Sequence, residues 1–256
     1  MYPWKVWRDS RSRIAIYTLA ALSTGILFGL QALASDASYR AYVLTYPRYR
    51  AYFSPGYQEL SFVPRFSNYV LVYGQYFALL SALILGAASV GKEYAAGTMN
   101  FLLTRPCPRR NFVLTDWKIS ISALIVIIGA LGFGIYPFFV FARAAGPGNV
   151  LALLPGLWAV AIALFGLSHF TTALAGSTAR GIILAAGAAV AYTQLPIALK
   201  LWWHSDWAYD ATEWTFRMFE WSWGPPRIDW PPTIFWLVVA AGFLAGSAAV
   251  LRYREV

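Results

Sequence analysis

Six apolar runs of about 20 residues limit what this chain can fold into more than any other feature. They lie at residues 14–34, 68–90, 119–142, 150–175, 181–201 and 233–251. A helix rises 1.5 Å per residue, so about 20 residues cross the roughly 30 Å hydrocarbon core of a bilayer. Because backbone groups cannot stay unpaired in lipid, each run should be a transmembrane helix. The expected fold is therefore an all-α integral membrane protein with six transmembrane helices.

The composition supports this interpretation. Of the 256 residues, 59% are hydrophobic and only 12% are charged, which is too apolar for an ordinary soluble domain. A net charge of +9 fits basic cytoplasmic loops better than nucleic-acid binding. The single cysteine, Cys107, excludes an intramolecular disulfide and a multi-cysteine metal site. We therefore expect residues 1–256 to form one transmembrane domain, with no nucleic-acid partner and no bound metal.

The charge distribution indicates which side of the membrane each loop occupies. Six spans put the N-terminus, residues 91–118, the turn at 176–180 and the C-terminal residues 252–256 on one side. These segments hold twelve of the 20 Lys and Arg residues but only four of the eleven acids. Since Lys and Arg are enriched in cytoplasmic loops, both termini should lie in the cytoplasm, an N-in, C-in topology. The short turn should make spans four and five antiparallel neighbours.

The N-terminal segment allows two readings. Residues 1–13 are basic and carry Trp4 and Trp7 three positions apart, which suits an interfacial N-terminal helix and equally a frayed basic tail. The first apolar run could also belong to a signal peptide, because residues 32–34 resemble a cleavage site. That run is longer than the apolar core of about 7 to 15 residues in such peptides, so we expect a retained helix.

The loop before the last span is rich in tryptophan. Residues 202–232 hold seven of the twelve tryptophans and five of the eleven acids. Indoles at this density indicate short re-entrant or interfacial elements before span six. An ordinary aromatic belt at the membrane surface explains part of the pattern.

One apparent nucleotide motif fails on inspection. Residues 86–93 read GAASVGKE, which follows the phosphate-binding pattern G-x-x-x-x-G-K. Glu93 then replaces the Ser or Thr that would hold magnesium, and no strand precedes the motif. We therefore expect no nucleotide-binding domain in this chain.

The two histidines have no evident chemical partners nearby in the sequence. His169 lies within the fourth span and His204 in the outer loop. As the spans are drawn, His169 is the only readily titratable side chain inside them, which makes it a functional candidate. We favour a structural role, with a neutral imidazole bonded to a nearby hydroxyl or a facing helix. The absence of acids from the spans argues against a carrier driven by an ion gradient.

Residues 91–118 form a polar and basic island between spans two and three. Positions 95, 99, 102 and 103 put apolar side chains on one helical face. Arg105 precedes Pro106, which ends helical geometry there. We therefore expect a helix over residues 93–104 that lies on the cytoplasmic membrane surface with its polar face open to a partner. That face would consist of Glu93, Gly97, Asn100 and Thr104.

This island resembles the signature of type-2 ATP-binding-cassette (ABC) permeases. The matching residues are Glu93, Gly97, Thr98, Leu102, Leu103, Arg105, Pro106, Arg109 and Lys118. Cys107 departs from the aliphatic residue that is frequent after the proline. The resemblance extends to the plan of six spans with an interfacial N-terminal helix and a cytoplasmic helix between spans two and three. It implies a type V exporter-like fold and a permease subunit that is not itself an enzyme.

The resemblance also implies the partners and the contact site. The permease would pair with a second copy or a related permease and bind two copies of an ABC ATPase subunit. ATP and magnesium would bind that ATPase, and this chain would hold no cofactor. The residues that would form its ATPase-coupling helix and flank it are Glu93, Tyr94, Gly97, Thr98, Asn100, Leu102, Leu103, Arg105, Pro106 and Arg109.

The expected function is that of an exporter permease in the cell membrane, plasma or inner. The substrate pathway would include Gln31, Gln75, His169 and Gln194. Its apolar walls favour a lipid-like or amphipathic substrate, with membrane lipids as neighbours. Three alternatives stay open: a subunit that transmits mechanical work without transport, a carrier independent of an ATPase, and a membrane enzyme or scaffold in which folding supplies partners to His169 or His204.

Overall fold

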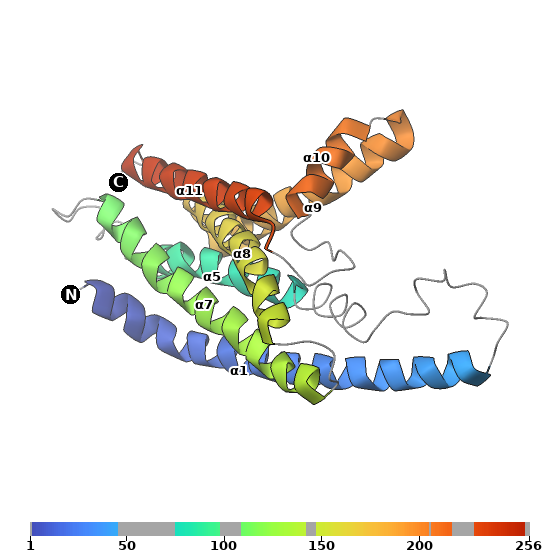
Figure 1. The fold of residues 1–256 in the computed structure, drawn as a ribbon. Coiled ribbons are helices and arrows are strands. Elements are labelled where there is room, and N and C mark those ends of the chain that lie inside the picture. Colours follow the sequence, from blue (N-terminus) through green and yellow to red (C-terminus); the bar gives the residue numbers. More distant parts are fainter. Residues whose placement is uncertain are drawn as a thin grey trace.

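A computed structural model describes residues 2–45, 75–97, 109–141, 147–204, 206–216 and 228–253. Its helices are α1 (Tyr2–Thr45), α5 (Gln75–Ala95), α7 (Arg109–Phe141), α8 (Pro147–Ala175), α9 (Thr178–Trp203), α10 (Asp206–Phe216) and α11 (Trp230–Tyr253). No strand occurs in these ranges (Figure 1). The expectation of an all-α protein is confirmed.

Six of these helices are long and apolar enough to cross a membrane. The candidate spans are Ser10–Gln31, Tyr76–Ala95, Leu114–Phe138, Leu154–Ala175, Thr178–Trp203 and Trp230–Tyr253. Each overlaps one of the predicted runs, although residues 68–74 of the second run lie outside the described residues.

Two predicted span boundaries differ from the observed ones in a way that bears on the site. The second span continues past residue 90 to Ala95, and the third begins at Leu114 and not at residue 119. The predicted boundaries stopped near charged residues, but a helix continues until a residue breaks it. Glu93 and Asp116 therefore fall within the spans.

α1 is one uninterrupted helix, in which residues 2–9 continue directly into the first candidate span. An interfacial position for these N-terminal residues stays a prediction. No Gly or Pro lies between residues 4 and 24, so nothing there ends the helix. α1 packs along α7 at a close crossing. A Cβ atom on Gly25 would meet the Leu131 carbonyl, and one on Gly134 would meet the Leu22 carbonyl, so glycine allows the two backbones to approach.

α8 is the central helix of the bundle, and it packs against α5, α7, α9 and α11. In its most apolar stretch of 18 residues 78% are buried, against 6% in the corresponding stretch of α9. Small residues such as Ala159, Ala161 and Ala163 are fully buried there beside Phe165. α8 therefore connects the other helices of the core, while α9 lies at the edge with its apolar side chains exposed.

The turn between α8 and α9 is as short as predicted. Gly176 has φ of 65° and donates its N–H to the Thr172 carbonyl at 2.9 Å, the left-handed geometry that commonly ends a helix. α9 begins at Thr178, and the Thr171 hydroxyl donates to the Gly181 carbonyl at 2.9 Å. The two helices are therefore adjacent and antiparallel.

The short helix α10 precedes α11, where a short element was predicted. It packs against α9 and α11, and the α9–α10 pair projects from the bundle (Figure 1). Trp236 of α11 donates its indole N–H to the Thr215 carbonyl at 2.8 Å. The position of α10 relative to the membrane stays a prediction.

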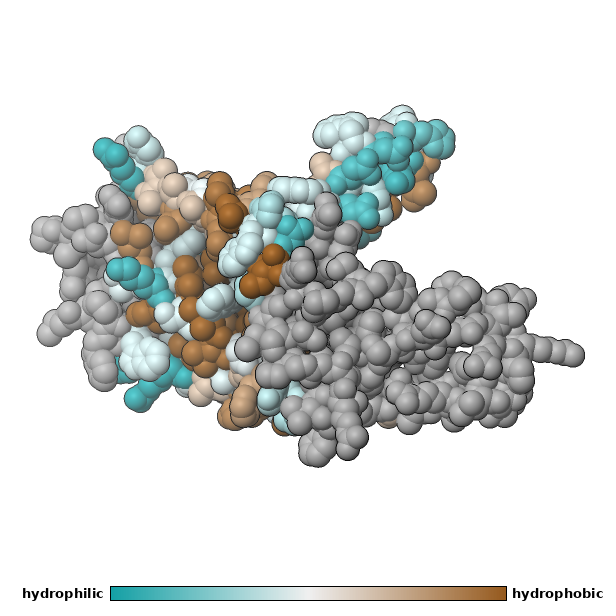
Figure 2. Space-filling model, viewed as in Figure 1, coloured by the Kyte–Doolittle hydropathy of each residue, from teal (hydrophilic) through white to brown (hydrophobic). Residues whose placement is uncertain are grey.

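Both termini lie at the same end of the bundle (Figure 1). We call this the inner end, after the predicted cytoplasmic side; it holds the starts of α1, α7 and α9 and the ends of α5, α8 and α11. On the face shown in Figure 2, hydrophilic residues gather near this end and on the projecting α9–α10 pair, with apolar surface between them. This distribution is typical of a protein that spans a membrane.

Candidate functional site

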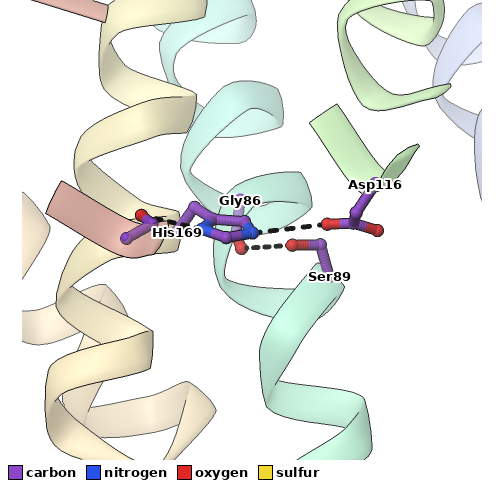
Figure 3. A network of polar contacts seen from close by, with 5 residues as sticks. Gly86, Ser89, Asp116 and His169 are labelled. Carbon is purple, nitrogen blue, oxygen red and sulfur yellow. Dashed lines mark hydrogen bonds and ion pairs between the residues drawn. The ribbon is translucent and has the colours of Figure 1, made fainter. Parts of the chain in front are cut away.

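Three polar side chains from three helices meet near the inner end of the bundle. His169 of α8 places Nε2 3.4 Å from Oδ2 of Asp116 on α7. Its Nδ1 lies 3.1 Å from Oγ of Ser247 on α11. All three residues are buried, with exposed fractions of 1% or less. Figure 3 shows the imidazole directed toward Asp116. With the contact to Ser247, a single ring connects α7, α8 and α11.

The three residues meet because they lie at the same depth. Asp116 is seven residues from the start of α7, while His169 and Ser247 are each six residues from the ends of α8 and α11. At 1.5 Å per residue, each is about 10 Å from the inner end. Ser89 of α5 lies at a similar depth and donates its hydroxyl to the Gly86 carbonyl at 3.0 Å (Figure 3). One polar layer thus crosses the apolar bundle.

The contacts of His169 complement each other. If Ser247 donates its hydroxyl proton to Nδ1, the imidazole proton lies on Nε2 and faces the carboxylate of Asp116. The 3.4 Å separation is within ion-pair range, but the two atoms are not aligned as a hydrogen bond. Neither atom has another hydrogen-bond partner among the described residues. Both ring nitrogens of His169 therefore depend on partners from other helices.

Aromatic rings enclose the polar layer. Trp117 packs edge-on against Phe165 with centroids 5.4 Å apart and against the His169 ring at 6.0 Å. Gly166 leaves room for this indole, since a Cβ there would lie 2.9 Å from the Trp117 ring. The rings are buried and exclude water, which strengthens the electrostatic interaction between His169 and Asp116.

Ser247, His169 and Asp116 are the residue types of a hydrolytic triad, but their setting excludes that role. A catalytic serine must reach a substrate, whereas Ser247 and His169 are completely buried. Among the described residues, no three His, Cys, Asp or Glu side chains form a group that could hold a metal ion. His204, the other histidine, is exposed at the end of α9. These three side chains connect helices, and a substrate could not reach them.

The end of α5 differs from the predicted amphipathic helix. α5 ends at Ala95, and Gly97 adopts φ of 66° with its N–H donated to the Tyr94 carbonyl at 3.1 Å. The prediction of one helix from 93 to 104 is therefore wrong at its start, because glycine in the left-handed region ends α5. Glu93 is 3% exposed and belongs to the last turn of the span, so it is not part of an open polar face.

The remaining residues of the predicted coupling site fall into four groups. Tyr94 is partly buried and donates its hydroxyl to the Ala173 carbonyl of α8 at 3.4 Å. Gly97 is exposed, and no atom of the described residues lies within 4 Å of a Cβ placed on it. Arg109 begins α7. Those outside the described residues are Thr98, Asn100, Leu102, Leu103, Arg105 and Pro106.

The predicted substrate-pathway residues do not share a surface. Gln31 and Gln194 are exposed on α1 and α9, while His169 is fully buried. Gln75 is the first residue of α5. The role of these residues in a pathway stays a prediction, and His169 belongs to the polar layer.

Sequence reasoning missed Asp116 as the partner of His169. The statement that His169 is the only titratable residue within the spans is wrong, because Asp116 and Glu93 are also there and buried. The argument against a gradient-driven carrier loses its basis with it. A signal was present: Asp116, Ser120 and residues 123, 124 and 127 recur at helical spacing, and all are buried. The helical period therefore continued past the charge of Lys118.

Comparison with known families gave one match. The profile described as ABC-2 family transporter protein matches residues 13–204, which is most of the chain. Comparisons with curated proteins and with solved structures gave no match. The matched range includes Asp116 and His169, but ends before α10 and α11.

Proposed function

We propose a transport function because the chain belongs to the ABC-2 transporter family. Permeases of this family are non-catalytic membrane subunits that work with ATPase subunits. In the proposed function, the chain couples ATP hydrolysis on a separate chain to the export of an amphipathic substrate. In this proposal residues 1–256 form one permease domain without a nucleotide-binding domain. ATP and magnesium bind the partner ATPase.

The polar layer is the observation that supports this coupling role most directly. The segment between α5 and α7 is flanked by Tyr94, which is bonded to α8, and by Asp116, which faces His169 of α8. His169 in turn contacts Ser247 of α11. A force on this segment would therefore reach α8 and α11 within about 10 Å of the inner end. Packed helices joined in this way move as rigid bodies.

The ATPase contact is proposed for the exposed turn after α5 and the residues that follow it. Ala95, Ala96 and Gly97 are exposed at the inner end, and the next residues carry the family-like signature. Glu93 and Tyr94 would support this turn from within the fold, because Glu93 is buried and Tyr94 is bonded to α8. Arg105 and Arg109 add positive charge to the segment, which could also bind lipid phosphates.

The assembly and its location extend the proposal. Two ATPase copies would bind a pair of permeases, either identical or related, in the cell membrane. The chain is a multi-pass membrane protein with six candidate spans, and α9 exposes a long apolar surface that a second permease or lipid would cover. Because most of the side chains in the membrane-spanning helices are apolar, we propose a lipid-like substrate over a small ion.

Purification tests the proposal. The tagged chain would be extracted from its native membrane in mild detergent, with and without reversible cross-linking, and the proteins that accompany it identified by mass spectrometry. We expect an ABC ATPase in the complex and vanadate-sensitive ATP hydrolysis by the preparation. An untagged strain serves as the control. Recovery of the folded chain without any ATPase, even after cross-linking, would contradict the proposal.

Orientation has an independent test. Cys107 is the only thiol in the chain and lies in the segment between α5 and α7. A membrane-impermeant maleimide should label it only after the cells are permeabilised. Labelling in intact cells would place this segment outside and rule out contact with a cytoplasmic ATPase.

A further inference from the structure

A cavity of about 640 Å³ that is open to the surface lies between α9 and α10, and Phe235 of α11 also lines it. α9 contributes Tyr192, Leu195 and Leu199, each about one turn from the next. α10 contributes residues from 207 to 215, which recur along one face of that helix. This volume is within the range of about 300 to 1,000 Å³ typical of small-molecule sites.

The hydroxyl groups in the lining are already bonded. The Tyr192 hydroxyl lies 2.9 Å from Oγ1 of Thr215, and Thr215 donates to the Thr212 carbonyl at 2.7 Å. Thr212 donates to the Ala208 carbonyl at 2.9 Å. Among the residues that the structure describes, no Asp, Glu, Lys or Arg lines the cavity. Because a polar ligand would lose its water without gaining new partners, the lining favours an apolar occupant.

The cavity begins at residues that mark a membrane surface. Next to Leu199, the Lys200 ammonium lies 3.3 Å from Asp206 and 3.9 Å from the centre of the Tyr209 ring. Beyond them Trp202 and Trp203 are 75% and 70% exposed. Exposed indoles beside a lysine are typical of the level of lipid headgroups.

From that level the cavity runs into the apolar part of α9. Leu199 and Ala191 bound the α9 lining and are eight residues apart, which is about 12 Å along a helix. Half of the hydrocarbon core is about 15 Å. The α9 side of the cavity is therefore about as long as one leaflet is deep, measured from a predicted headgroup level. The exposed acids Asp210 and Glu213 of α10 lie outside the cavity lining.

We propose that this cavity binds one acyl chain of a phospholipid from the leaflet on the side of the α9–α10 turn. The headgroup lies outside the cavity, near Lys200 and Trp202, and the chain extends towards Ala191. The bound chain fills the space between α9 and α10 and so holds the projecting pair at a fixed angle. This proposal requires only that the chain spans a membrane, and it is independent of coupling to an ATPase.

Photolabelling tests the site. The full-length protein is reconstituted in phosphatidylcholine vesicles that contain a small fraction of phosphatidylcholine with a diazirine in the middle of one palmitoyl chain. After illumination, adducts are mapped by mass spectrometry. We expect them to concentrate on cavity residues such as Leu195 and Ala208. Adducts spread evenly over the exposed apolar faces of α9 and α11 would overturn the proposal.

Matched variants sharpen the result. Ala208→Phe places a ring in the cavity and should lower the adduct yield there at least fivefold. Ala188→Phe adds the same ring on the exposed surface of α9 outside the lining and should leave the yield unchanged. Leu195→Ala enlarges the cavity, so the other cavity residues should still be photolabelled. This variant tests the site even if Ala208→Phe does not fold. Equal labelling in both phenylalanine variants would refute the site.

Competition identifies the occupant. At a fixed fraction of the diazirine lipid in the phosphatidylcholine vesicles, added free palmitate should leave the adducts on the cavity residues unchanged. If palmitate reduces these adducts, the occupant is a free fatty acid and the phospholipid proposal is wrong. Co-purification of an ATPase with Ala208→Phe is measured separately, so a failure of this site and a failure of the proposed function can be distinguished.

Discussion

His169 and Asp116 lie on neighbouring helices with Nε2 and Oδ2 3.4 Å apart, and both residues are buried. Each supplies the other with a partner that the apolar surroundings cannot provide. Removal of one member leaves a buried polar group unpaired, whereas removal of both does not. This asymmetry makes the pair accessible to experiment.

The first prediction concerns the free energy of unfolding in detergent. His169→Leu alone should lower it by about 3 kcal/mol, because the Asp116 carboxyl stays buried without its partner. Asp116→Leu alone should have a similar effect. The double variant should cost clearly less than the two single effects added together, which a double-mutant cycle measures. Additive effects would show that the two side chains do not interact.

A smaller effect is expected at the other end of the polar layer. Ser247→Ala removes the hydroxyl that lies 3.1 Å from Nδ1 of His169 and should lower the free energy of unfolding by about 1 kcal/mol. Ser122→Ala is the matched control, since its exposed hydroxyl bonds only to the Lys118 carbonyl of its own helix. Equal effects of the two variants on the thermal midpoint would contradict the assignment.

Gly86 should not tolerate a methyl group. A Cβ there would meet the Phe165 carbonyl and lie 3.0 Å from Cβ of Ser168, so α5 would have to move away from α8. We expect Gly86→Ala to lower the free energy of unfolding by about 1 to 3 kcal/mol. Gly242→Ala serves as the control, because no atom lies within 4 Å of its added Cβ. A stable Gly86→Ala protein would mean that the two helices do not pack as closely as described.

Gly97 offers a test of the turn that leads into the proposed ATPase contact. Its φ of 66° disfavours a β-branched residue by about 1 to 2 kcal/mol, while asparagine tolerates this conformation. Within the part of the chain that the structure describes, space is not limiting, since nothing there lies within 4 Å of an added Cβ. We therefore expect Gly97→Val to reduce ATPase co-purification several-fold and Gly97→Asn to retain it. If the same amount of ATPase co-purified with both variants, the geometry of this turn would not matter for ATPase binding.

Several features could be predicted from the sequence because each depends on residues that are close together along the chain. The apolar runs specify six long helices, and glycine at position 176 in a short polar gap predicts the turn between α8 and α9. The tryptophan-rich loop predicted a short element where α10 lies. The ends of the helices were less predictable, because the helical hydrogen-bond pattern continues past a charged residue when no Gly or Pro interrupts it. Glu93 was therefore assigned to the wrong element.

The sequence by itself determined that this chain spans a membrane, how many helices it uses and, through the signature around Gly97, which family to expect. Only the tertiary structure decided that Asp116 meets His169 and Ser247, and that an open cavity lies between α9 and α10. The physical reason is that hydropathy and family signatures follow the order of residues along the chain. Contacts between distant residues depend on the depth and rotation of packed helices, which side-chain packing settles only when all of them are assembled.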